Sequence, residues 1–144
     1  MGLDMYLQGR FKALYGTDKS KCGRKTLGDM FPEIGCEVSY VVFELGYWRK
    51  ANAIHNWFVE NCQDGIGECQ ESEVTKEHLL SLKEECLGYL NGTSDGPEPV
   101  GGFFFGSTER DEGYKQDMED TVRICDVALN AIENGCDIIY QSSW

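Results

Sequence analysis

The residues best suited to binding chemistry lie in the segment YWRKANAIHNWF, positions 47–58. It combines two tryptophans, a tyrosine, an arginine, a lysine, two asparagines and one of the chain's two histidines. Cationic side chains can meet phosphate, amides and imidazole can hydrogen-bond a sugar or base, and aromatic rings can stack on a base. Two interpretations follow: a binding surface for a small anionic ligand, or an amphipathic helix with an unusual mixture of residues.

Apolar residues at Ala51, Ile54, Phe58 and Cys62 recur at helical spacing and predict a helix over 49–62. In that helix Arg49 would share a polar face with other residues, because positions three and four apart are neighbours. The predicted polar row is Arg49, Asn52, Asn56 and Glu60, with His55 between this row and the apolar stripe.

A helix beginning at 49 would place Arg49 and Lys50 in its first turn, where the helix dipole is positive. This placement costs roughly 0.3–1 kcal/mol per cation, and a bound anion would relieve it. The predicted ligand-binding residues are Trp48, Arg49, Lys50, Asn52, His55, Asn56 and Phe104, with Trp48 or Phe104 as the stacking surface. In the structural alternative the cations pair with Glu44 or another acid, Trp57 and Phe58 pack in the core, and His55 is a hydrogen-bonded structural residue.

Other motifs carry weaker chemical signals. The seven cysteines are an odd number without a C-x-x-C pair, which favours reduced thiols in packing roles. A zinc site from Cys62, Cys69, His78 and Cys86 has unusual spacing, and no cysteine–histidine pair shows a local catalytic signature. Asp4 and the acids of 109–120 suit a solvated face better than a divalent metal site. We therefore predict no metal, no cofactor and no catalytic residue.

The segment GGFFFGSTERDE lacks the phosphate-binding pattern G-x-x-x-x-G-K-[ST]. Glu109, Asp111 and Glu112 follow it and would repel a phosphate. Its three phenylalanines are expected to close the core or line a pocket.

The order of the predicted elements favours an α+β class. The expected elements are a strand over 5–16, a long loop over 17–35 with a helical turn at 27–31, a strand over 36–48, the helix over 49–62, a helix capped by Thr75 that ends at 90, a short strand in GFFFGS (102–107), a helix over 111–134 with a Thr108–Asp111 capping box, and a strand over 137–144. This order does not alternate as in a doubly wound sheet. It predicts a mainly antiparallel sheet covered by about three helices in a single domain, 1–144.

The net charge of −12 divides unevenly, because residues 1–50 sum to +2 and residues 51–144 to −14. A strongly acidic protein is repelled by nucleic acid and anionic membranes, so neither is an expected partner. The beginning MGLDMYLQGR has no basic or apolar region of a signal peptide, and no apolar run is long enough to span a membrane. We expect a cytoplasmic protein, and the polarised charge would permit a homo-oligomer.

Four motifs together resemble a group of small uncharacterised proteins encoded by tailed bacteriophages and some bacteria: MGLDMYL, YWRKANAIHNWFV, GFFFGSTE and the terminal SSW. The resemblance spans most of the chain and implies an accessory phage-type protein in the bacterial cytoplasm. It implies no activity and no catalytic residue.

The leading hypothesis is therefore a non-enzymatic protein that sequesters a small anionic, nucleotide-like ligand, such as a host immune signal. Phosphate would meet Arg49 and Lys50. An acidic inhibitor of a host protein is the alternative, motivated by the charge of residues 51–144. A nucleotide-processing hydrolase is the third hypothesis, because it would need most of the same pocket.

Overall fold

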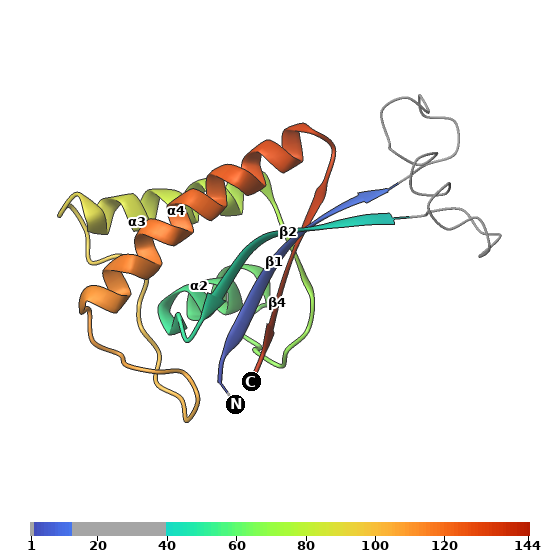
Figure 1. The fold of residues 1–144 in the computed structure, drawn as a ribbon. Coiled ribbons are helices and arrows are strands. Elements are labelled where there is room, and N and C mark those ends of the chain that lie inside the picture. The colour runs from blue at the N-terminus through green and yellow to red at the C-terminus, as the bar shows by residue number, and fades with distance from the viewer. Residues whose placement is uncertain (1, 13–39) are drawn as a thin grey trace.

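The computed structural model describes residues 2–12 and 40–144 of the chain (Figure 1). Within them, four strands and three helices follow in the order β1, β2, α2, β3, α3, α4, β4. The predicted loop at 17–35, its helical turn and the outer ends of the first two predicted strands lie outside the described residues.

The four strands form one antiparallel sheet in the order β2-β1-β4-β3. β1 (Asp4–Lys12) pairs on one side with β2 (Tyr40–Arg49) and on the other with β4 (Asp137–Ser143), the last strand of the chain. β3 (Ser72–Val74) extends the sheet beyond β4. Figure 1 shows the first and last strands side by side in the middle of the fold.

Three helices, α2 (Asn52–Cys62), α3 (Lys76–Leu90) and α4 (Glu112–Glu133), form the hydrophobic core together with the sheet. Phe58 of α2 stacks on Tyr140 of β4 with ring centroids 4.0 Å apart. Trp48 of β2 donates its indole N–H to Thr121 Oγ1 of α4 at 2.9 Å. These contacts cover one face of the sheet with helices and confirm the predicted antiparallel α+β fold.

Helix starts agree with the sequence where a side chain caps the backbone. Thr75 accepts from the His78 N–H at 3.2 Å, and the His78 ring accepts from the Thr75 N–H, so a histidine completes the capping box. Asp111 caps α4 by accepting from the Tyr114 N–H at 3.1 Å. The expected pairing of Thr108 with Asp111 is wrong, because Asp111 is itself the cap.

The prediction for one short segment is also wrong, and one short strand was not predicted. GFFFGS is a turn, not a buried strand: the Phe103 side chain is 95% exposed and Gly106 adopts a φ of 86°. The Phe105 and Ser107 carbonyls accept hydrogen bonds from the Asn52 side chain of α2, whereas in a strand such carbonyls would pair with the backbone of a neighbouring strand. β3, with three residues, was missed because so short a strand leaves no periodic pattern.

Among the described residues, no helix combines the length and apolar character that a membrane span requires.

Candidate functional site

The connection between β2 and α2 differs from the sequence prediction. Arg49 is the last residue of β2, Lys50 has a φ of 60°, and α2 begins only at Asn52. The Lys50 N–H donates to the Leu3 carbonyl at 2.7 Å, and the Asn52 N–H donates to the Lys50 carbonyl at 2.9 Å. The cations therefore precede the helix, and the prediction that they lie in its first turn is wrong, because strand pairing extends through Arg49 opposite Asp4.

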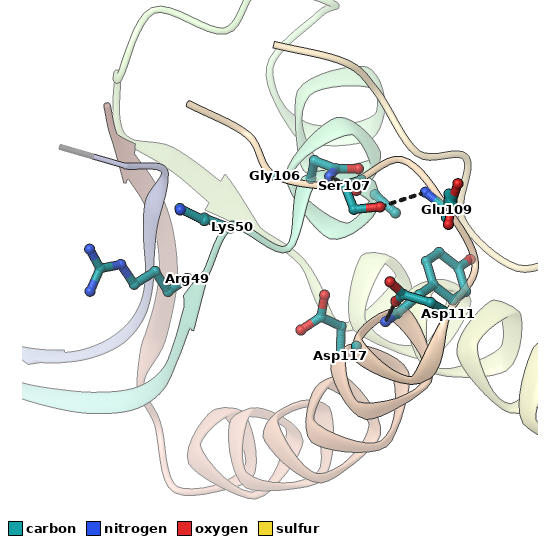
Figure 2. Close-up of a pocket in the computed structure, with 11 residues that line it drawn as sticks. Arg49, Lys50, Gly106, Ser107, Glu109, Asp111 and Asp117 are labelled. Atoms are coloured by element: carbon teal, nitrogen blue, oxygen red, sulfur yellow. Dashed lines mark hydrogen bonds between the residues drawn. The ribbon is translucent and has the colours of Figure 1, made fainter. Parts of the chain in front are cut away.

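A pocket of about 250 Å³ lies beside this connection (Figure 2). Its walls come from the end of β2, the start of α2, the segment before α4 and the first turns of α4. The lining residues are Arg49, Lys50, Asn52, Ala53, Gly106, Ser107, Glu109, Asp111, Gly113, Tyr114 and Asp117.

Two cations stand at one side of the pocket. The Arg49 side chain is 61% exposed, and its Nε lies 3.9 Å from Asp4 Oδ1, so the acid that pairs with it, expected to be Glu44 or another acid, is Asp4. Lys50 is exposed, and its ammonium has no ion pair with any residue of the described ranges. In Figure 2 the charged ends of both side chains point away from the acids of α4, although both residues line the pocket. Lys50 is therefore available to an incoming anion, whereas Arg49 would have to leave Asp4.

The opposite side of the pocket is acidic. Glu109 is exposed, and Asp111 uses one carboxylate oxygen to cap α4. Asp117 is half-buried, points toward the space between Lys50 and Asp111, and accepts no side-chain hydrogen bond from the described part of the chain (Figure 2). Burial raises the pKa of Asp117 to about 6, with smaller contributions from Asp120 and Asp111. A half-buried carboxylate without a donor is an unusual group in a pocket wall.

Asn52 builds the wall between the two charged sides. Its Nδ2 donates to the Phe105 carbonyl at 3.0 Å and to the Ser107 carbonyl at 2.6 Å, and its Oδ1 accepts from the Val100 N–H at 3.2 Å. The side chain is 4% exposed, so these bonds occur in a buried setting. Asn52 thus fastens the segment before α4 across the start of α2.

The other predicted ligand residues lie away from the pocket. Trp48 is 4% exposed and packs in the core, which covers the ring expected to stack on a ligand. Asn56 donates to the Glu98 carbonyl at 3.3 Å, outside the pocket lining. Phe104 accepts the Leu3 N–H through its carbonyl at 3.2 Å, and its ring contacts Phe103.

His55 has the surroundings of a structural residue. It is 3% exposed, and its Nδ1 lies 2.8 Å from the Tyr140 hydroxyl. Phe105 and Trp144 present ring edges to it at centroid distances of 5.2 Å each. Burial lowers the pKa of His55 to about 4, so the imidazole is neutral at physiological pH.

The pocket also contains residues that sequence reasoning did not select, above all Asp117. One signal could have identified it: Tyr114, Met118 and Thr121 form the buried face of α4, and Asp117 lies on that face at helical spacing. A charged residue on an apolar helix face calls for a partner or a ligand.

The structure also describes the cysteine and histidine residues that were considered for a zinc site or a catalytic pair. Cys62 Sγ lies 3.5 Å from His78 Nδ1, but the same nitrogen already accepts the Thr75 N–H. Burial raises the pKa of the Cys62 thiol to about 12, so this thiol is not activated as a nucleophile. Within residues 2–12 and 40–144, no group of three or more His, Cys, Asp or Glu side chains is arranged to hold a metal ion.

The pocket therefore joins three of the predicted residues, Arg49, Lys50 and Asn52, to an acidic wall that was not predicted. Such a site can bind a ligand through opposite charges at its two ends. Comparisons with protein-family models, curated protein sequences and solved structures give no match to the chain.

Proposed function

We propose that the chain binds a small, nucleotide-like ligand that carries an anionic group at one end and N–H donors at the other. The observation that carries the proposal is that one pocket is lined both by the cations Arg49 and Lys50 and by Asp117, whose carboxylate accepts no hydrogen bond from the described residues. A phosphate at the rim would meet both cations, and N–H groups inside would meet the carboxylate.

Charge on both sides of the pocket disfavours simpler ligands. A free phosphate that entered fully would approach Asp111 and Asp117, which repel it. A simple cation would be attracted by the acids but would have no favourable interaction with Lys50. A ligand with both kinds of group satisfies both sides at once.

The size of the pocket further limits the ligand. Its volume of about 250 Å³ is slightly below the roughly 300 Å³ at which ligand pockets usually begin. This supports a mononucleotide with its base enclosed and its phosphate at the rim, and it disfavours a dinucleotide. In contrast to the sequence-based hypothesis, the phosphate lies outside the helix start, and Trp48 takes no part.

Isothermal titration at pH 8 with nucleoside monophosphates, the free nucleosides and ribose 5-phosphate tests the proposal. We expect at least one monophosphate to bind more tightly than either of its halves. Lys50→Ala should weaken binding of the monophosphate and leave that of the free nucleoside unchanged. Lys76→Ala is the matched control, because Lys76 begins α3 and does not line the pocket.

The same samples distinguish binding from turnover. Chromatography of the nucleotide after incubation should return it intact if the protein sequesters its ligand, whereas a new product would identify an enzyme. If no panel member produces heat with a folded protein, or if Lys50→Ala and Lys76→Ala behave alike, the proposal fails. An acidic surface that binds a host protein would then be the next hypothesis to test.

A further inference from the structure

We propose that Asp117 determines which ligand the pocket accepts, by selecting a planar group with two adjacent N–H donors. Among nucleobases, the edge of guanine formed by N1–H and the 2-amino group has this pattern. The inference rests on the proposed function, because it assigns the inner end of the same ligand.

The Asp117 carboxylate has no hydrogen-bond donor among the described residues. An ionised carboxylate has two acceptor oxygens and no donor, so its best partner offers two parallel N–H groups. Asp111, its neighbour in the pocket, already accepts the Tyr114 N–H. In the described part of the chain, no side chain or backbone N–H donates to Asp117, so both of its oxygens remain for a ligand.

The helical turn that carries Asp117 is held in place by buried hydrogen bonds. Thr121 Oγ1 donates to the Asp117 carbonyl at 2.6 Å and accepts the Trp48 indole N–H at 2.9 Å. Thr121 is fully buried, and Trp48 is 4% exposed. This chain of hydrogen bonds ties the helical turn that carries Asp117 to the sheet. A carboxylate on a fixed element discriminates between ligand edges better than one on a loop.

The protonation state of Asp117 depends on the charged groups around it. Glu109, Asp111, Arg49 and Lys50 line the same pocket, the two cations with their charged ends directed away from Asp117, and Asp120 lies one turn further along α4. Because the pKa of Asp117 is about 6, the carboxyl gains a proton just below neutral pH. The protonated form offers one donor and one acceptor, which suits the N1 and 6-amino edge of adenine. Preference for guanine should therefore weaken on acidification.

The experiment compares GMP, IMP and AMP, which differ at the base edge and share the same ribose phosphate. At pH 8 we expect affinities in the order GMP, IMP, AMP, with about tenfold between the first and last. Asp117→Asn provides one donor and one acceptor and should reverse the preference between GMP and AMP. Asp64→Asn, beyond the far end of α2, is the matched control and should keep the parental order.

Repeating the titrations at pH 5.5 should lower the ratio of GMP to AMP affinity several-fold. Taking the ratio cancels the titration of the phosphate, which both ligands share. L-Arginine forms a further arm, because its guanidinium carries the same pair of donors. Tighter binding of arginine than of GMP, lost in Asp117→Asn, would support the role of Asp117 and assign the donors to a guanidinium.

The outcomes separate the two proposals. Equal affinity for the three nucleotides, or an unchanged order in Asp117→Asn, would overturn this inference and leave the proposed function standing. Absence of binding by every nucleotide and by arginine, with the fold intact, would overturn both.

Discussion

Replacement of Asp117 by asparagine should stabilise the ligand-free protein, and the gain should depend on pH. Burial raises the pKa of this carboxyl from an ordinary value of 3.8 to about 6. The folded state therefore retains a proton that the unfolded state loses between about pH 4 and pH 6. Stability falls as pH rises through that window and stays reduced above it. Asparagine does not titrate, so the variant avoids this loss.

The size of the effect follows from the pKa. A difference of about two pKa units corresponds to ~3 kcal/mol at 1.36 kcal/mol per unit. Solvent reaches part of the half-buried carboxylate and screens it, so we expect roughly half of this value, ~1.5 kcal/mol. For a chain of this length, the gain corresponds to a rise in Tm of about 3–6 °C at pH 8.

Thermal unfolding followed by circular dichroism from pH 4 to pH 8 measures the gap between Asp117→Asn and the parent. The gap should open between pH 4 and pH 6 and remain constant above pH 7. Asp64→Asn, a carboxylate-to-amide change outside the pocket, is measured alongside as the matched control. A gap for Asp117→Asn that is independent of pH, or an asparagine variant less stable than the parent at pH 8, would refute a raised pKa at Asp117.

Three further substitutions test the surroundings of the pocket. Lys50→Gly removes the strain of a φ of 60° and should raise the free energy of unfolding in urea by ~1 kcal/mol. The same change should weaken binding of the monophosphate in titration. A loss of stability would show that the Lys50 backbone is not strained. Gly46→Ala would place its Cβ 2.4 Å from Ile124 Cγ2, so we expect a loss of about 2–3 kcal/mol in the free energy of unfolding. Ile124→Ala removes the clashing atoms, so the double variant should lose less stability than the sum of the two single variants. Asn52→Ala removes three buried hydrogen bonds and should lower the free energy of unfolding by about 2–3 kcal/mol. Asn56→Ala removes a single hydrogen bond and should lower it by less. Protease cleavage between 98 and 107 should accelerate in Asn52→Ala only.

Sequence patterns predicted the elements whose periodicity is long. The helix over 111–134 matches α4, and the helix after Thr75 matches α3, because apolar residues recur there over several turns and a side chain caps each start. The antiparallel α+β class followed from strands at both ends of the chain. β3 and the GFFFGS turn were not predictable, since their conformations depend on partners distant in sequence, such as Asn52 for the turn.

The site was predicted in part. The cations were identified from their types, but the start of α2 was placed too early, because the pairing of Arg49 with Asp4 and the bond from Lys50 to Leu3 are invisible in local sequence. Trp48 belongs to the core because Thr121, 73 positions later, satisfies its indole N–H. The position of Asp117 on the buried face of α4 could have been read from the helical spacing, but its presence in the same pocket as the two cations depends on the fold.

The position of β4 in the sheet also has a consequence for how the protein is made. β4 lies between β1 and β3, so two of the three pairings of the sheet need residues 137–143. On the ribosome, β1 is made before β4, and Asp4 cannot meet Ser143 until all the residues between them have been synthesised. Until then one edge of β1 and the apolar side chains of Met5 and Leu7 lack their neighbours. Sequence-distant pairing of this kind slows folding, and it exposes the nascent chain to aggregation and to chaperones during translation.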